Sequence, residues 1–381
     1  MRRPLILIVL CHFLASFSVL GMSPYYPTLL ERSYGLKDPA LGGFFYVIPL
    51  LIMGLAGPLW GWFADRFGKK ISLVRAQIGL ALALYLCSLA PNAWAFGLCL
   101  ALQGLFGGTF SASNALLAQY YRGPELSRSL CYLQYSARLG LFLAPCLLAL
   151  VVLEIPNPSV VYGWLWLLPI ASFGLLQSLL PAPPNQLEEA RAGEARQFHR
   201  VPFAWLLGME FWFTLMTVVT FPYFVKFFQA AHTGLPDRYA GFFFGIPHVI
   251  YLLLAFLVIG RAHVHQALGY LTFAFACFTG AMLAHLLPGA AFLLAARALM
   301  GIALVYGYVY LNQLVGAAVR PDSAGKSFGW LDTASKFAGV LAGLLAGATV
   351  RGGGLTAPFV ISALLGLPLT VVAWRMKRHY A

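Results

Sequence analysis

Charged residues are scarce in this sequence, since Asp, Glu, Lys and Arg make up only 10% of its 381 residues. A soluble globular domain carries about 25%, so the composition argues against an ordinary soluble fold. The six cysteines show no C-x-x-C spacing, which speaks against a disulfide framework or a thiolate metal site. The sequence also lacks H-E-x-x-H, G-x-S-x-G and a nucleotide-binding loop, which disfavours a membrane enzyme and leaves an ion gradient as the energy source. We expect no metal and no cofactor.

Apolar residues dominate instead, at 60% of the chain with a mean hydropathy of +0.79. Crossing the hydrocarbon core takes about 20 apolar residues per helix. Twelve stretches meet this length, namely 5–29, 40–63, 71–90, 94–120, 129–153, 160–180, 202–228, 240–260, 266–287, 289–318, 327–350 and 355–374. The sequence therefore predicts an all-α integral membrane protein with twelve transmembrane helices.

Two halves of the chain repeat each other. Residues 43–49 (GFFYVIP) recur as residues 241–247 (GFFFGIP), 198 positions later, with five identities. The offset also relates Pro24-Tyr25 to Pro222-Tyr223, Asn114 to Asn312 and Arg138 to Lys336. Membrane carriers that alternate access are built from such repeats. We predict two pseudo-symmetric six-helix bundles, 1–180 and 201–381, joined by a polar linker at 181–200.

The net charge of +13 could suggest a nucleic-acid partner, but its distribution indicates membrane topology. With the N-terminus in the cytoplasm, the tails and even-numbered loops hold seventeen Lys and Arg residues. The opposite loops hold four: Arg32, Lys37, Arg238 and Arg351. This is the positive-inside bias. We expect a multi-pass protein of the bacterial inner membrane, with both termini cytoplasmic, the lipid bilayer as partner and no nucleic acid. The apolar N-terminus resembles a signal peptide, but we expect an uncleaved first helix.

Residues 61–73 read GWFADRFGKKISL. They resemble the signature loop of the major facilitator superfamily, G-x-L-a-D-r-x-G-r-k-x-x-l, with Phe63 in place of the usual leucine. Together with the repeat, the resemblance spans essentially the whole chain and implies a secondary transporter. It also implies a cytoplasmic latch between the bundles, formed by Gly61, Asp65, Arg66, Gly68 and Lys69. An ordinary basic loop is the alternative.

Residues 140–145 (GLFLAP) are similar to the G-x-x-x-G-P segment of the superfamily's exporting antiporters, although Ala144 replaces a glycine. This similarity implies export. Generic packing of small residues is the alternative.

Ionisable residues inside membrane spans are costly and normally face the protein interior or an aqueous cavity. The superfamily resemblance implies that helices one, two, four and five and their mates line that cavity. Arginine suits carboxylate or phosphate groups because its guanidinium binds them with two hydrogen bonds. The candidate substrate-binding residues are Arg138, Arg297, Lys336, Asn114, Asn312 and Gln134. Lys336 could instead pair only with Asp332, one turn away.

Proton coupling is expected at Glu210, His12 and Asp332. Glu210 and His12 are repeat mates at offset 198. Alternatively, Glu210 merely neutralises Arg297 or Arg138. Tyr25 and Tyr223, at the ends of helices one and seven, are candidate gating residues or interface anchors.

The short loops and the stretches around Gln103–Asn114 and Ser136–Arg138 look similar to exporters of carboxylate-type siderophores. The resulting hypothesis is a monomeric, proton-coupled exporter of a small anionic metabolite. A multidrug efflux antiporter and an uptake permease for a small organic anion remain as alternatives.

Overall fold

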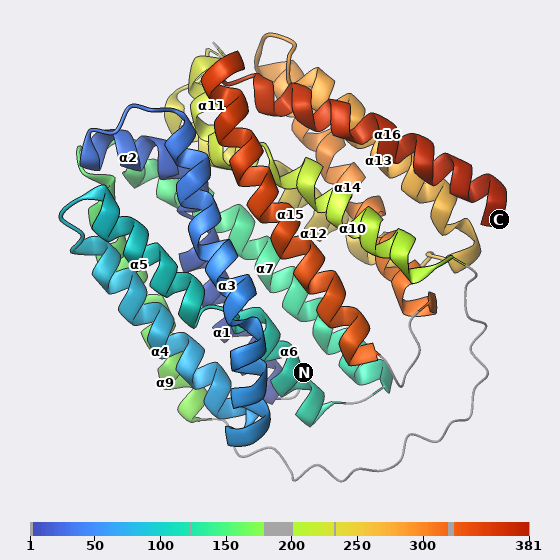
Figure 1. Cartoon of the computed structure of the whole chain (residues 1–381), viewed down its shortest axis with the longest axis horizontal. Coiled ribbons are helices and arrows are strands. Elements are labelled where there is room, and N and C mark those ends of the chain that lie inside the picture. The colour runs from blue at the N-terminus through green and yellow to red at the C-terminus, as the bar shows by residue number, and fades with distance from the viewer. Residues whose placement is uncertain (1–2, 122, 179–200, 232–233, 319–323, 381) are drawn as a thin grey trace. The chain divides into compact units, whose positions relative to one another are not determined.

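The computed structural model describes residues 3–121, 123–178, 201–231, 234–318 and 324–380 (Figure 1). All regular elements within these residues are helical, and twelve helical spans are long and apolar enough to cross a membrane. This confirms the predicted all-α membrane fold and its twelve spans. The predicted linker at 181–200 lies outside the described residues.

The chain divides into two compact units, one of Met1–Lys37 and Ile48–Arg191, the other of Asp38–Val47 and Ala192–Ala381. The first unit holds α1 (Arg3–Leu20), η1 (Ser23–Tyr25), α2 (Tyr26–Tyr34), most of α3 (Ala40–Phe67), α4 (Lys69–Ser88), α5 (Ala93–Phe106), α6 (Thr109–Tyr120), α7 (Gly123–Val152), η2 (Pro158–Val161), α8 (Tyr162–Leu165) and α9 (Leu167–Gln177).

The second unit holds α10 (Phe203–Val218), η3 (Phe221–Tyr223), α11 (Phe224–Ala230), η4 (Asp237–Tyr239), α12 (Ala240–Ile259), η5 (Val264–Gln266), α13 (Ala267–Ala284), α14 (Ala290–Ala318), α15 (Ala324–Gly353) and α16 (Ala357–Tyr380). It also includes residues 38–47, which we call the 38–47 segment, although the repeat pattern alone would assign them to the first bundle.

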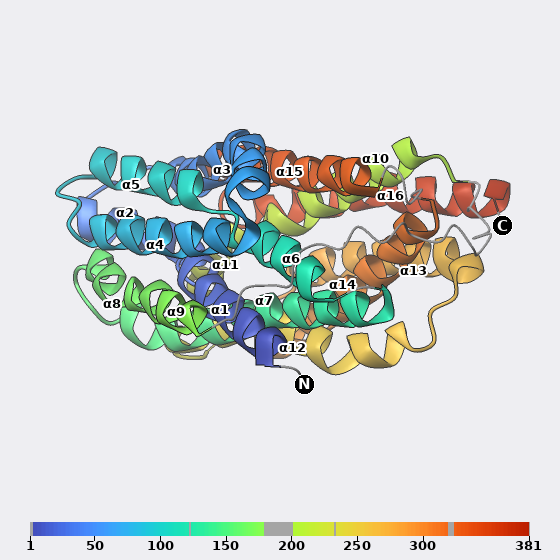
Figure 2. The same ribbon diagram turned by 90° about the horizontal axis from the view of Figure 1, so that it is seen from below.

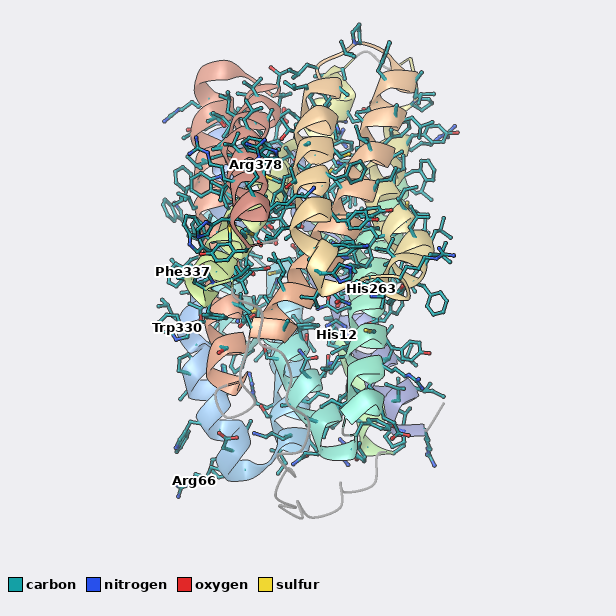
Figure 3. All side chains as sticks on the ribbon, turned by 90° about the vertical axis from the view of Figure 1, so that its right-hand side faces the viewer. His12, Arg66, His263, Trp330, Phe337 and Arg378 are labelled. Carbon is teal, nitrogen blue, oxygen red and sulfur yellow. The ribbon has the colours of Figure 1, made fainter. Side chains whose placement is uncertain are left out.

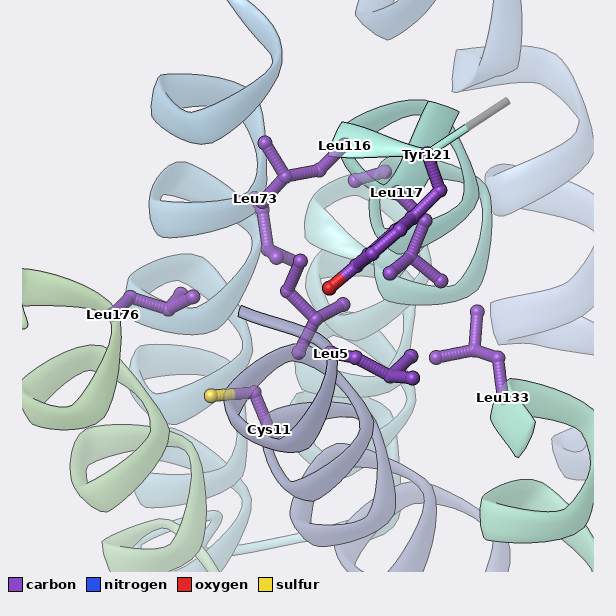
Figure 4. Packing of buried hydrophobic residues seen from close by; sticks show 10 residues of the cluster. Leu5, Cys11, Leu73, Leu116, Leu117, Tyr121, Leu133 and Leu176 are labelled. Atoms are coloured by element: carbon purple, nitrogen blue, oxygen red, sulfur yellow. The ribbon is translucent and has the colours of Figure 1, made fainter. Parts of the chain in front are cut away.

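Within the first unit, α1 packs against α7 and α9, and α4 packs against α5 and α9 (Figures 1 and 2). Leucines from α1, α4, α6, α7 and α9 form a buried cluster (Figure 4). Its labelled members are Leu5, Cys11, Leu73, Leu116, Leu117, Tyr121, Leu133 and Leu176. In a bilayer such a cluster is stabilised by close packing rather than by exclusion of water.

The first and seventh spans break at homologous positions. A 3-10 turn, η1, separates α1 from α2, and a similar turn, η3, separates α10 from α11. Pro24 and Pro222 lie in these turns, 198 positions apart. Proline donates no backbone hydrogen bond and therefore favours an interruption of the helix.

The fourth span is also broken, at Gly107 and Gly108, between α5 and α6. Gly108 has a φ of 87°, a conformation that favours glycine. Two carbonyl groups at the end of α5 find donors on neighbouring helices: Trp60 Nε1 donates to Leu105 O at 2.6 Å, and Arg75 donates to Phe106 O at 3.2 Å. The break is therefore stabilised by side chains of α3 and α4.

The repeat is visible in the packing of glycine on proline. A Cβ atom at Gly104 of α5 would lie 2.4 Å from the carbonyl oxygen of Pro49 in α3. A Cβ atom at Gly301 of α14 would lie 3.0 Å from the Cα atom of Pro247 in α12. Each unit thus seats a glycine of its fourth span on the proline of its second span, which requires close approach of the two backbones.

Candidate functional site

The first unit buries a polar cluster between α1 and α7. The His12 side chain is 2% exposed, and its Nδ1 lies 2.7 Å from Ser136 Oγ. Ser136 Oγ donates its own hydrogen to the Leu133 carbonyl at 2.7 Å, so it accepts a hydrogen from His12 Nδ1. Ser16 Oγ lies 3.5 Å from both ring nitrogens. We call His12, Ser16 and Ser136 the first polar cluster; Figure 3 labels His12.

The second unit carries a matching group between α10 and α15. Ser335 Oγ donates to Glu210 Oε1 at 2.6 Å, and Thr214 Oγ1 lies 3.4 Å from the same oxygen. Glu210 is half-buried, and Thr214 is 9% exposed. We call Glu210, Thr214 and Ser335 the second polar cluster.

The two clusters are related by the repeat. His12 and Glu210 are 198 positions apart, as are Ser16 and Thr214, whereas Ser136 and Ser335 are 199 apart. Each unit therefore places an ionisable side chain on its first span, with hydroxyl partners one turn later and on its fifth span. Sequence reasoning found the ionisable pair but missed the hydroxyls. A search for hydroxyl residues 198 positions apart would have identified Ser16 and Thr214. It would have missed Ser136 and Ser335, because these two are 199 positions apart.

The other predicted substrate-binding residues lie in different surroundings. Lys336 Nζ contacts Asp332 Oδ2 at 2.6 Å on α15, so these two residues form the mutual ion pair that the sequence allowed. Arg138 is half-buried on α7, two residues after Ser136. The three polar candidates are on α6, α7 and α14: Asn114 is half-buried, whereas Gln134 and Asn312 are exposed.

Arg297 belongs to neither polar cluster. Its side chain is 1% exposed inside the second unit. Nε donates to the Phe243 carbonyl at 2.8 Å, a terminal nitrogen donates to the Phe244 carbonyl, and the guanidinium lies 4.1 Å from the Phe224 ring centroid. Glu210 is not among these partners, so the geometry gives no support to the alternative that Glu210 neutralises Arg297.

Tyr25 and Tyr223 are both buried and both bind backbone atoms within their own units. The Tyr25 hydroxyl donates to the Pro145 carbonyl at 2.6 Å. The Tyr223 hydroxyl donates to the Pro39 carbonyl at 2.5 Å and accepts from the Gly43 amide at 2.8 Å. With exposures of 0% and 1%, neither ring has the exposed position of a membrane-interface anchor.

Further contacts hold the 38–47 segment on α15. A Cβ atom at Gly43 would lie 2.2 Å from the Gly343 carbonyl oxygen and 2.8 Å from the Gly347 nitrogen. Arg351 forms an ion pair with Asp38 at 2.9 Å. The helix backbones therefore touch directly along these glycines, and Tyr223 reinforces the contact.

The signature loop is a tight turn between two helices. α3 ends at Phe67 and α4 begins at Lys69, so Gly68 alone connects them, with a φ of 102°. Asp65 pairs with Lys69 across the turn. Gly61 has open space where a Cβ would lie, and Arg66 lies near the end of α3 (Figure 3). Local geometry therefore explains these residue types. Glycine can adopt the positive φ of the turn, and opposite charges on the two helices attract each other across it.

Comparison with known proteins agrees with this architecture. A family model described as the Major Facilitator Superfamily matches residues 8–266. Multidrug resistance protein MdtG of Citrobacter koseri is 39% identical over 107 residues, and that of Salmonella arizonae 37%. Each match covers 27% of this chain and 26% of the relative, so the chain spans about a quarter of the length of these relatives.

Two solved structures show the same fold over nearly all of the chain. The human organic anion transporter MFSD10 (TETRAN) superposes with a TM-score of 0.72 at 17% identity, covering 98% of this chain and 99% of that one. A D-xylose–proton symporter superposes with a TM-score of 0.76 at 15% identity, covering 98% and 97%. At these identities the likeness concerns the fold alone.

Proposed function

Because the chain belongs to the major facilitator superfamily and is therefore a membrane transporter, we propose that it exports a small anionic metabolite in exchange for protons. We propose a carboxylate-type siderophore as the substrate class. The observation that carries the proposal is the second polar cluster. It presents a half-buried carboxyl group, Glu210, with a serine hydroxyl from another helix 2.6 Å away. A carboxyl group inside a membrane span costs free energy when ionised, so proton loading and release there can be tied to the transport cycle.

The preference for an anion follows from the basic residues beside the two clusters. Arg138 follows Ser136 by two positions, and its repeat mate Lys336 follows Ser335 by one. Each unit thus carries a cation on the helix that supplies the serine. Arg138 and Lys336 are the two candidate cations for a substrate carboxylate, and Lys336 also forms an ion pair with Asp332. We place Arg297 outside the proposed substrate site, because its guanidinium is buried against backbone carbonyls.

We expect Arg138→Ala to weaken the binding of citrate, the simplest multi-carboxylate probe, by about tenfold to a hundredfold, the range that loss of a charge-assisted hydrogen bond predicts. Arg138→Lys should restore only part of the affinity, since lysine lacks the two-pronged geometry. Arg128→Ala is the matched control, because Arg128 lies on the same helix and is exposed. Isothermal titration of the purified transporter measures all three. Unchanged citrate affinity in Arg138→Ala would refute the anion site.

Multidrug efflux is the second candidate function, and the partial similarity to MdtG favours it. A multidrug exporter would carry cationic and neutral dyes and would not depend on Arg138. Ethidium efflux from cells that overproduce the protein separates the two functions: efflux that survives Arg138→Ala supports the multidrug function. The fold does not choose between substrates, because its solved neighbours are transporters of organic anions and of xylose.

We further propose that the transporter resides in the bacterial inner membrane as a monomer with both termini in the cytoplasm. This topology would put the signature loop on the cytoplasmic side and the 38–47 segment on the outer side. Alkaline phosphatase fused after Lys37 should be active, whereas fusions after Gly193 and at the C-terminus should be inactive. Green fluorescent protein fusions should give the reverse pattern. An active phosphatase at Gly193 would overturn the topology and the charge argument behind it.

A further inference from the structure

Burying the charged side chain of Arg297 inside a membrane span costs free energy. An arginine in a membrane span normally faces a water-filled cavity or an acidic partner. Arg297 is 1% exposed and has no ion pair within the described part of the chain. Backbone and aromatic groups take the place of a carboxylate. Its partners are the Phe243 and Phe244 carbonyls, Met300 Sδ at 3.3 Å, and the faces of Phe224 and Phe244.

The bonded carbonyls belong to the turn of α12 that precedes Pro247. In a regular helix the Phe243 carbonyl would accept from the amide of residue 247, but that residue is proline and has no N–H. Arg297 Nε supplies the missing donor at 2.8 Å, and a terminal nitrogen binds the next carbonyl. The arginine therefore fixes α12 at Pro247 from the neighbouring helix α14.

The same guanidinium also contacts the start of α11. It lies 4.1 Å from the ring centroid of Phe224, within the range of a cation–π interaction. Phe224 directly follows Tyr223, whose hydroxyl binds Pro39 and Gly43 of the 38–47 segment. Arg297 is thus linked through two adjacent residues to the contact that holds this segment.

The first unit has the same glycine-on-proline packing without an arginine at the corresponding position. The packing of Gly104 on Pro49 corresponds to that of Gly301 on Pro247. Gly104 and Gly301 are 197 positions apart, one fewer than the general offset of the repeat. The residue 197 positions before Arg297 is Leu100, which is fully buried. Leucine fills the homologous position, so an apolar side chain is sufficient to pack the two helices there. The buried charge of Arg297 therefore has a role other than filling space.

We propose that Arg297 is a positioning residue for the outer closure: it holds Pro247 and Phe224 in one arrangement, so that Tyr223 keeps the 38–47 segment docked on α15. The inference rests on the proposed transport function: the outer side would open when this segment leaves α15 and close when it returns. It does not depend on the substrate.

The test measures docking directly. Ala40 is 3% exposed in the docked segment, so Ala40→Cys reports undocking by its reaction with a membrane-impermeant maleimide. Mass spectrometry of the peptide containing residue 40 reads this site apart from the native cysteines. In the Ala40→Cys background we expect Arg297→Leu to raise the labelling rate by about tenfold or more, and Arg297→Lys to raise it less. A tenfold change corresponds to about 1.4 kcal/mol.

Phe224→Leu removes the ring but leaves the bonds of Arg297 to α12, and it should also raise the rate. If Arg297→Leu does not insert, this variant decides the question. The matched control is Phe359→Leu, which removes a ring that packs on His285 and Phe227 but does not lie under the guanidinium. Parental labelling in inserted Arg297→Leu and Phe224→Leu overturns the proposal, as does equal labelling in the Phe359 control. The assay needs neither substrate nor proton gradient, so a wrong substrate class leaves its outcome intact.

Discussion

Glu210→Gln is expected to abolish transport driven by a pH gradient while substrate exchange continues. The glutamine keeps the size of the side chain and its hydrogen bond with Ser335, but it can neither release nor take up a proton. Proteoliposomes with an imposed pH gradient measure the driven rate, which should fall to that of empty vesicles. Counterflow in the same vesicles without a gradient measures exchange, which should remain near the parental rate.

Asp332→Asn is the matched control for this experiment. Asp332 is a second carboxylate on the same membrane-spanning unit, but its Oδ2 is engaged in an ion pair with Lys336 Nζ at 2.6 Å. We therefore expect Asp332→Asn to retain gradient-driven transport. The assignment of Glu210 fails if Glu210→Gln still accumulates substrate against its gradient, and coupling moves to Asp332 if the effects of the two variants are reversed.

The overall architecture was predictable because it depends on patterns that are local or strictly periodic. Apolar stretches of sufficient length gave the twelve spans, and the 198-residue offset related the first six to the last six. The breaks around Pro24 and Pro222 have their cause in the residues themselves. The break at Gly107 and Gly108 follows equally from glycine, but its donors, Trp60 and Arg75, come from other helices.

The site was only partly predictable, because its hydrogen bonds join residues far apart in the chain. The sequence marks Glu210 as an intramembrane carboxyl group, but it does not show that Ser335 is its partner. Arg297 shows the opposite difficulty, since a basic residue in a span resembles a substrate ligand. Its hydrogen bonds to the Phe243 and Phe244 carbonyls become visible only when α12 and α14 are side by side. The role of Tyr223 likewise depends on its hydrogen bonds with the 38–47 segment, which the sequence does not show.

The second large effect is expected at Gly43, where α3 meets α15. Gly43→Ala would place a methyl group 2.2 Å from the Gly343 carbonyl oxygen and 2.8 Å from the Gly347 nitrogen, so one of the backbones must shift. Overpacking of this kind costs about 1–3 kcal/mol, which would shift the docking equilibrium about fivefold to a hundredfold. Because a carrier must visit both the docked and the undocked arrangement, we expect the transport rate to fall by about tenfold or more.

Gly57→Ala in the same helix separates this effect from a general effect of alanine. Apart from its chain neighbours and the backbone of its own helix, no atom lies within 4 Å of a Cβ built at Gly57. Alanine also favours a helix over glycine by about 1 kcal/mol. Gly57→Ala should therefore keep the parental transport rate with equal or higher thermal stability. Parental transport by Gly43→Ala would show that the cycle does not require the 38–47 segment to dock as closely as it does here. Loss of transport in both variants would assign the effect to the flexibility of α3 rather than to its contact with α15.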